Sequence, residues 1–102
     1  MNKTVTVRIL KLAGSFAENK DTAREIRLNT IQPALKKDQQ IVIDFNGVEA
    51  ATQSFIHALI TQPIRDSGIG VLDHIAFKDC SETVQQIIEI VVDYMQHEDK
   101  QS

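Results

Sequence analysis

The sequence predicts an α/β fold in which strands and helices alternate along the chain as β-α-β-α-β-α. Three short segments have strand character, and each precedes a segment with helix-start signals or 3.6-residue periodicity. Such alternation is typical of a mostly parallel sheet, here of three to four strands, connected by about three helices. With so few strands, helices are expected to cover mainly one face of the sheet and to leave the rest as a candidate contact surface.

The first strand is predicted over residues 4–10, where β-branched and polar residues alternate. Gly14-Ser15 then breaks the pattern. A helix start follows within Asp21–Glu25, whose threonine and glutamate have the spacing of a capping box and whose aspartate is a competing N-cap. This helix is expected to run to about Lys37 and to be kinked or split by Pro33.

The second strand is predicted at Ile41–Phe45, because a short and almost wholly apolar run is typical of a central strand covered on both faces. Asn46-Gly47 then turns the chain. The second helix is expected to span roughly Gln53 to Asp66. Pro63 falls within its last turn, and Gly68 stands at a position typical of a helix C-cap.

The third strand is predicted at His74–Lys78, and the third helix follows Ser81, which can cap it. Glu82 lies in the first turn, where the helix dipole favours negative charge. One apolar face then repeats at helical spacing and consists of Val84, Ile87, Ile88, Val91, Val92 and Met95. This is the clearest helical periodicity in the chain.

Length and charge limit the possible functions. The chain has 102 residues, 11 basic and 14 acidic, with a net charge of −3. This length fits one domain, placed at residues 1–96 and followed by a polar tail at 97–102. The basic residues are scattered, with Lys36-Lys37 their only adjacent pair, so no nucleic-acid partner is expected. A single cysteine, with no signal peptide or long apolar run, predicts a cytoplasmic protein without a membrane segment.

No residue pattern points clearly to catalysis, and we expect the protein not to be an enzyme. Cys80 lies at a helix start, which can lower a thiol pKa, but no flanking cation obviously helps and a simple packing role is favoured. The three histidines show no metal-ligand spacing, and His57 is expected to pack beside its apolar neighbours. Asp44 and Glu49 lack an identifiable third partner for acid-base chemistry. No metal or cofactor is therefore expected.

The start of the second helix is the most informative part of the chain. Thr52 and Ser54 fall where backbone N–H groups point outward and the helix dipole favours negative charge. An anion or phosphoryl group would be stabilised there, at the carboxyl end of a parallel sheet. The simpler interpretation, which is favoured and compatible with the first, is that Thr52 or Ser54 caps the helix.

The segment that ends in this helix start has the pattern Ile43-Asp44-Phe45-x-Gly47-Val48-Glu49-x-x-Thr52-Gln53-Ser54-Phe55. It resembles the STAS domain superfamily, named for sulphate transporters and anti-sigma-factor antagonists, and is most similar to the STAS-like family of unknown function. In the antagonists, Asp-Ser-Ser-Gly begins the helix, and a partner kinase phosphorylates the second serine. Ser54 matches that serine, whereas Thr52, Gln53 and Phe55 replace the other three residues.

The resemblance covers essentially the whole chain, including Leu12-Ala13-Gly14-Ser15-Phe16 before the first helix. It implies a non-catalytic regulatory module of the antagonist type, which binds an ATPase-type kinase or an anti-sigma-like regulator and is switched by phosphorylation at Ser54. The implied partner surface consists of Gln53, Phe55, Ile56, His57 and Ile60. Phe55 in place of glycine makes the helix start bulkier and is expected to hinder a partner from approaching as in the antagonists.

Two alternatives stay open beside this module. A small-ligand sensor is the first, since some STAS relatives bind nucleotides or other anions, and the backbone amides of Thr52–Phe55 would hold the ligand. A homodimer is the second. Ile56, Ile60 and Ile64 form an i, i+4, i+8 row, which is core in most helices and marks a partner surface where it is exposed.

Overall fold

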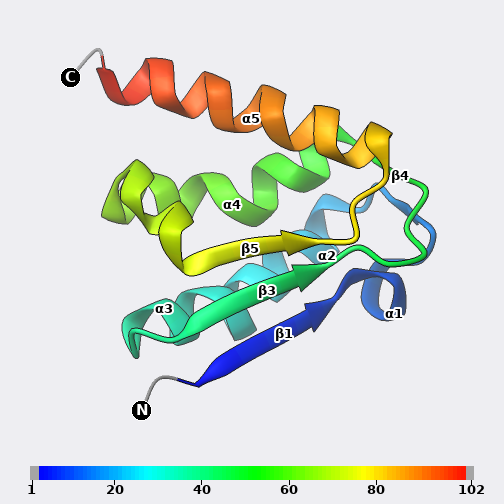
Figure 1. The fold of residues 1–102 in the computed structure, drawn as a ribbon, viewed down its shortest axis with the longest axis horizontal. Coiled ribbons are helices and arrows are strands. Elements are labelled where there is room, and N and C mark those ends of the chain that lie inside the picture. The colour runs from blue at the N-terminus through cyan, green and yellow to red at the C-terminus, as the bar shows by residue number, and fades with distance from the viewer. Residues whose placement is uncertain (1–2, 101–102) are drawn as a thin grey trace.

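The computed structural model describes residues 3–100, and its main feature is a three-stranded parallel sheet with the strand order β1-β3-β5 (Figure 1). The strands are β1 (Thr4–Arg8), β3 (Gln40–Asp44) and β5 (Ile75–Lys78), and both pairings are parallel. Parallel neighbours need long connections, and here these connections contain the helices. The predicted α/β class and the parallel sheet are therefore confirmed.

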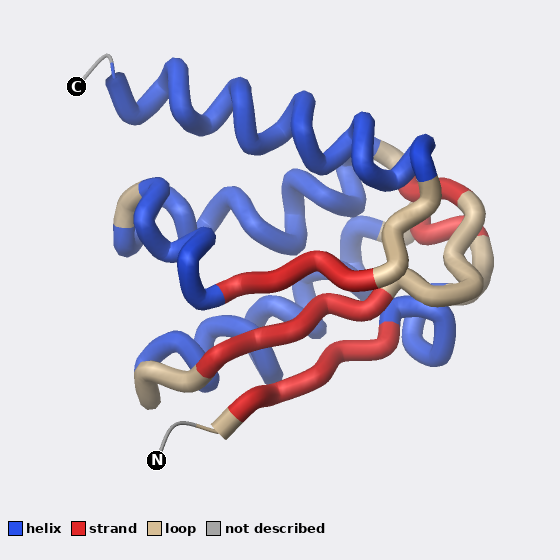
Figure 2. The backbone as a smooth tube through the Cα atoms, in the orientation of Figure 1, coloured by secondary structure: helices blue, strands red, loops and turns tan. Residues whose placement is uncertain are grey.

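Helices cover only one face of this sheet. Along β3, Ile41 and Ile43 are buried, whereas Gln40, Val42 and Asp44 point to the other face and are half-buried. No helix crosses in front of the three strands in Figure 2. The expectation that the central strand is covered on both faces is therefore wrong, and its nearly unbroken apolar run reflects packing on one face plus a single outward valine.

The first strand is shorter than its alternating pattern predicts. β1 ends at Arg8, where its ladder with β3 also ends, and the chain continues as the short helix α1 (Ile9–Ala13). Ile9 stays fully buried, but Leu10 and Leu12 become exposed. Gly14 ends α1 with a φ of +84°, a backbone conformation that glycine adopts without strain.

The long segment after β1 is a helix in three pieces. It consists of α2 (Lys20–Ile26), a π-helical turn (Arg27–Ile31) and α3 (Gln32–Lys36). The predicted split lies where Pro33 lacks the N–H that would bond the carbonyl four residues earlier, so the wide π turn absorbs the misfit. The cap is different from the predicted one.

The N-cap of α2 is Asn19, whose Oδ1 accepts hydrogen bonds from the backbone N–H groups of Asp21 and Thr22 at 2.9 and 3.3 Å. The expected capping box of Thr22 and Glu25 and the competing Asp21 cap are therefore wrong. Asparagine is as good an N-cap as aspartate, and the helix begins two residues earlier than an Asp21 cap would place it.

A second, two-stranded parallel sheet holds the entry to the central helix. It pairs β2 (Phe16–Ala17) with β4 (Ala50–Ala51). Next to it, the backbone N–H groups of Glu49 and Thr52 donate to the carbonyls of Ser15 and Ala17 at 2.8 and 2.9 Å. This short ladder fixes the position of the residues that precede the helix start.

Two long helices complete the layer. α4 (Gln53–Ser67) ends at Gly68 as predicted, and a 3₁₀ turn (Ile69–His74) leads from it to β5. α5 (Glu82–Lys100) is capped by Ser81, whose Oγ accepts the Val84 N–H at 3.1 Å. Every residue of its predicted apolar face is buried or half-buried. The helix continues past residue 97, where the sequence places a polar tail, and residues 101–102 lie outside the described part of the chain.

Candidate functional site

The candidate site is the first turn of α4. Thr52 is its N-cap, and the Thr52 Oγ1 accepts the backbone N–H of Phe55 at 3.1 Å. Capping, the favoured interpretation of Thr52, is thus what the structure shows. Gln53 and Ser54 follow in the first turn with exposed side chains. The first N–H groups of a helix have no partner inside the helix, so this turn presents donors and positive potential to an anion.

Ser54 has an accessible and unused hydroxyl. Within residues 3–100 its Oγ makes no hydrogen bond. The side chain lines a shallow hollow between α2 and α4, together with Lys20, Gln53, His57 and Ala58. Lys20 is therefore the one cationic residue among those that line the hollow of the Ser54 hydroxyl. This arrangement favours a negative charge on Ser54 twice, through the helix dipole and through the lysine.

His57 borders the same hollow from one turn further along α4. It is half-buried, and its Nδ1 lies 3.4 Å from the Oγ1 of Thr61. The Thr61 hydroxyl donates to the His57 backbone carbonyl at 2.6 Å, which satisfies the one fully buried polar side chain of this helix. Among the described residues, no group of three His, Cys, Asp or Glu side chains could hold a metal ion.

Three of the residues expected to bind a partner point into the core. Phe55, Ile56 and Ile60 are completely buried, so the expectation that their side chains form a partner surface is wrong. The row of Ile56, Ile60 and Ile64 is likewise core and offers no homodimer contact. The physical reason is that α4 packs between α2 and α5 and also against the 3₁₀ turn that follows it. Gln53, Ser54 and His57 remain as accessible residues of the expected surface.

The burial of Phe55 also changes what its replacement of glycine means. The ring adds bulk to the core and none to the outside of the helix start. The expected hindrance to a partner is therefore wrong. The backbone N–H of Phe55 donates to the Thr52 hydroxyl as well, so a capping hydrogen bond holds the turn.

A row of cations on α2 was not apparent from the sequence. Lys20, Arg24 and Arg27 are spaced i, i+4 and i+7, which places them along one side of the helix. That side faces α4, because Lys20 lines the Ser54 hollow and the Arg27 Nη1 donates to the Ala58 carbonyl at 3.3 Å. The spacing of these three basic residues is visible in the sequence, but they line up on one side only once the helix start at Lys20 is known.

The other residues considered for chemistry have structural roles. The Asp44 Oδ1 accepts the Asn46 N–H at 2.9 Å and so stabilises the turn after β3. Cys80 lies in the connection from β5 to α5, and its pKa is raised by burial first, then by the nearby carboxylates of Asp79 and Asp44. A raised pKa keeps the thiol protonated, which is the opposite of what an activated nucleophile needs.

Comparison with known families agrees with this geometry. A family model described as a STAS-like domain of unknown function (DUF4325) matches residues 22–85. The chain belongs to this family. The match runs from within α2 to the start of α5 and includes the Ser54 turn, whereas Lys20 lies just before it.

The chain has no match among curated proteins and none among solved structures. In the described part of the domain, no helix is both long and apolar enough to cross a bilayer. The family match confirms the resemblance seen in the helix-start pattern. It leaves the role of Ser54 to be argued from the site itself.

Proposed function

We propose that this STAS-like domain is a non-catalytic regulatory module that binds an ATPase-type kinase or anti-sigma-like regulator and is switched by phosphorylation of Ser54. The supporting observation is the Ser54 hydroxyl, which is exposed and unused in the first turn of a 15-residue helix and shares a hollow with Lys20. We place this module in the cytoplasm, where a kinase partner finds ATP.

The covalent step needs only the serine and the partner's ATP. The Ser54 oxygen attacks the γ-phosphorus, the bond from that phosphorus to the β-phosphate oxygen breaks, and ADP leaves. The hydroxyl proton passes to a base of the kinase. The STAS-like domain supplies no catalytic group in this step; it presents the hydroxyl on a rigid turn that Thr52 holds in place.

The phosphate changes binding and leaves the fold intact. It adds a charge of about −1.5 to −2 at pH 7, which the helix N-terminus and Lys20 stabilise. Ser54 is exposed, so no core contact is lost. A partner packed over the turn would instead have to desolvate a dianion, and its affinity falls. The switch therefore acts at the interface.

The test compares Ser54→Ala, Ser54→Asp and the wild type in binding to the partner that co-purifies and is identified by mass spectrometry. We expect Ser54→Asp to weaken binding by roughly tenfold or more, since an interfacial charge without a partner is costly. Ser54→Ala should bind like the wild type and should lose the phosphate that the wild type gains with ATP. Equal binding by both variants would rule out the switch.

Ser67→Asp is the matched control, because Ser67 is an exposed serine at the opposite end of the same helix. It introduces the same charge far from the first turn and should leave binding unchanged. Thermal melts of all variants separate a loss of binding from a loss of folding.

A small-ligand sensor is the second candidate, favoured by the same first-turn N–H groups and Lys20. A bound nucleotide or other anion would raise the melting temperature according to RT ln(1 + [L]/Kd). A thermal-shift screen with nucleotides tests it directly. Lys20→Gln should abolish any shift, and a flat screen at millimolar ligand eliminates this function.

A further inference from the structure

Beside its core face, α5 has a second apolar stripe that is more exposed, and Ile87, which also belongs to the core face, lies at the edge between the two. Ile87 is half-buried, and Ile90 and Tyr94 are 50% and 55% exposed. Their spacing of three and four residues aligns them along one side of the helix. A helix with apolar residues on two sides is typical of one that is covered on both.

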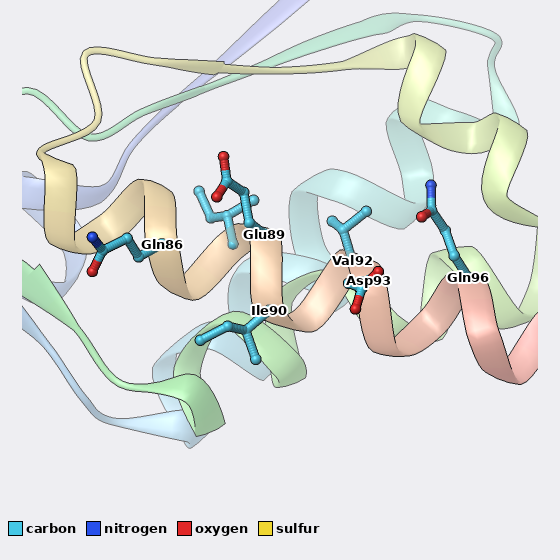
Figure 3. Close-up of a pocket in the computed structure, with 7 residues that line it drawn as sticks. Gln86, Glu89, Ile90, Val92, Asp93 and Gln96 are labelled. Atoms are coloured by element: carbon cyan, nitrogen blue, oxygen red, sulfur yellow. The ribbon is translucent and has the colours of Figure 1, made fainter.

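Figure 3 shows which way Ile90, one member of this stripe, points. In this view Glu89 projects from α5 toward the strands of the three-stranded sheet, whereas Ile90 projects to the other side of the helix, the side on which the short strands β2 and β4 lie. The opposite side of α5 faces β5, because Gln85, Ile88 and Glu89 line a shallow hollow together with Phe77. The stripe of Ile87, Ile90 and Tyr94 therefore belongs to the outer side of the helix layer, the side that faces away from the sheet.

The cationic row of α2 and the π-helical turn that follows it lies along the other flank of α4, where Lys20 shares a hollow with Ser54 and the Arg27 Nη1 donates to the Ala58 carbonyl. Lys20, Arg24 and Arg27 make no ion pair with any described residue. The acidic residues of α2, Asp21 and Glu25, each follow one position after a member of the row and so point about 100° away from it. This row is therefore a strip of positive charge on a chain whose net charge is −3.

α4 lies between the two rows, since it packs against α2 on one side and α5 on the other. Packed helix axes are about 8–10 Å apart, so the cationic row and the apolar stripe flank α4 on either side. A helix with a diameter of about 10–12 Å, laid over α4, would reach both. Ser54 and His57 lie on α4 between the two rows. We call the combined surface the outer helix face; it consists of Lys20, Arg24, Arg27, Ser54, His57, Ile87, Ile90 and Tyr94.

We propose that the outer helix face binds an acidic amphipathic helix of a partner protein, with its apolar side on Ile87, Ile90 and Tyr94 and its carboxylates on Lys20, Arg24 and Arg27. This inference rests on the proposed function, in that the face with Ser54 is the one that binds a partner. Charge complementarity to three unpaired cations determines the acidic character. Rows that follow helix axes at one-turn spacing match the i, i+3, i+4 and i+7 anchors of a docked helix.

The same surface explains how a phosphate on Ser54 would act on this particular partner. The phosphate would be next to Lys20 and would neutralise part of the cationic row. It would also repel the carboxylates of the partner helix directly. Phosphorylation would therefore remove an attraction and add a repulsion at one place, without moving any element of the fold.

The test uses a synthetic 18-residue helical peptide with leucines at i, i+3, i+4 and i+7 and glutamates elsewhere, and a twin with lysines in place of the glutamates. Binding is followed by fluorescence anisotropy and by amide chemical shifts of the full-length protein. We expect the acidic peptide to shift amides of α2 and α5 and to bind at least about tenfold more tightly than the twin. Equal binding of both peptides, or shifts confined to other elements, would overturn the proposal.

Two double variants should each weaken the acidic peptide by about tenfold or more, Ile90→Ser with Tyr94→Ser and Lys20→Glu with Arg24→Glu. The matched controls are Leu12→Ser, at a leucine that is 54% exposed on α1, and Lys36→Glu, at an exposed lysine on α3. All six positions are exposed, so melting curves should stay unchanged. Controls as weak as the double variants would contradict the assigned surface.

Three further results separate this inference from the proposed function. If the Ser54 variants change binding of the co-purified partner but neither double variant does, the partner binds elsewhere and only the outer helix face is refuted. If sedimentation shows a dimer that Ile90→Ser with Tyr94→Ser abolishes, the stripe is an interface between copies and the acidic helix is refuted. If the acidic peptide binds as expected but Ser54→Asp does not weaken the co-purified partner, the switch alone fails.

Discussion

Neighbouring residues at the start of α4 differ in exposure, because each residue of a helix is rotated by about 100° from the one before it. Thr52 caps the helix, Ser54 points to solvent, and Phe55 is fully buried. The serine is therefore accessible on a turn whose neighbours are fixed by a hydrogen bond on one side and by the core on the other. Chemistry at this residue has little effect on folding because the two functions use different side chains.

Cys80 provides a test at the level of one residue. Burial and then the Asp79 and Asp44 carboxylates raise its pKa above the ordinary value of 9.0, so the folded thiol should react with iodoacetamide at pH 8 more slowly than the thiol of the urea-unfolded chain. Asp79→Asn should speed the reaction of the folded protein. Asparagine tolerates the Asp79 φ of +55°, so this variant removes charge without adding backbone strain.

The same shift has a definite sign for stability. The unfolded thiol loses its proton at a lower pH than the folded one, so the free energy of unfolding is unaffected below about pH 9 and falls as pH rises above it. Cys80→Ser should remove this alkaline decline. A folded thiol that reacts as fast as the unfolded one would contradict the account of its environment.

At the level of elements, the sequence predicts the long periodic helices and the apolar strands better than the short pieces between them. The apolar face of α5, its Ser81 cap and the Gly68 end of α4 are all confirmed. α1, β2 and β4 were missed, because segments of two to five residues are specified by tertiary hydrogen bonds such as those to Ser15 and Ala17.

The candidate site was predicted in part for a related reason. The position of the helix start follows from local capping chemistry, which a sequence contains. Whether each side chain is buried depends on how many elements pack against α4. Because α2, α5 and the 3₁₀ turn all do so, the row of Ile56 and Ile60 is buried as well as the row of Phe55 and Leu59. The outer helix face combines residues from α2 and α5 that are about 70 positions apart, so no local pattern could show it.

The Thr52 cap can be tested as a property of α4. Thr52→Ala should lower the free energy of unfolding by about 1 kcal/mol, because the Phe55 N–H loses its acceptor. Thr52→Ser keeps an acceptor and should cost much less. Urea denaturation followed by circular dichroism measures both, and an equal loss for the two variants would mean that the threonine methyl group, and not the hydroxyl, matters here.

At the level of the whole molecule, one layer of helices packs on a three-stranded sheet. In the order β1-β3-β5, β3 is the strand that is paired on both sides. Its inward residues Ile41 and Ile43 are among the most buried in the described chain. α1, by contrast, is a five-residue helix with exposed Leu10 and Leu12. Stability should therefore be distributed unevenly, highest along β3 and lowest at α1.

Hydrogen exchange tests this distribution. Under native conditions the β3 amides, such as that of Ile43, should exchange only through global unfolding, and those of α1 should exchange through local opening many times faster. Two-dimensional NMR of the protein transferred to D₂O measures both sets in one sample. Protection of α1 equal to that of β3 would show that the short helix unfolds only with the core.

The strand order has one more consequence, which concerns polymerisation. Two of the three strands of the main sheet are terminal, so each molecule presents two unpaired backbone rows that could recruit further chains into a fibre. Both terminal strands end in a cation, Arg8 on β1 and Lys78 on β5. Copies that joined like edges in the same direction would set arginine against arginine or lysine against lysine. These two cations therefore disfavour the parallel pairing of like edges, the arrangement that would extend the sheet from one molecule to the next.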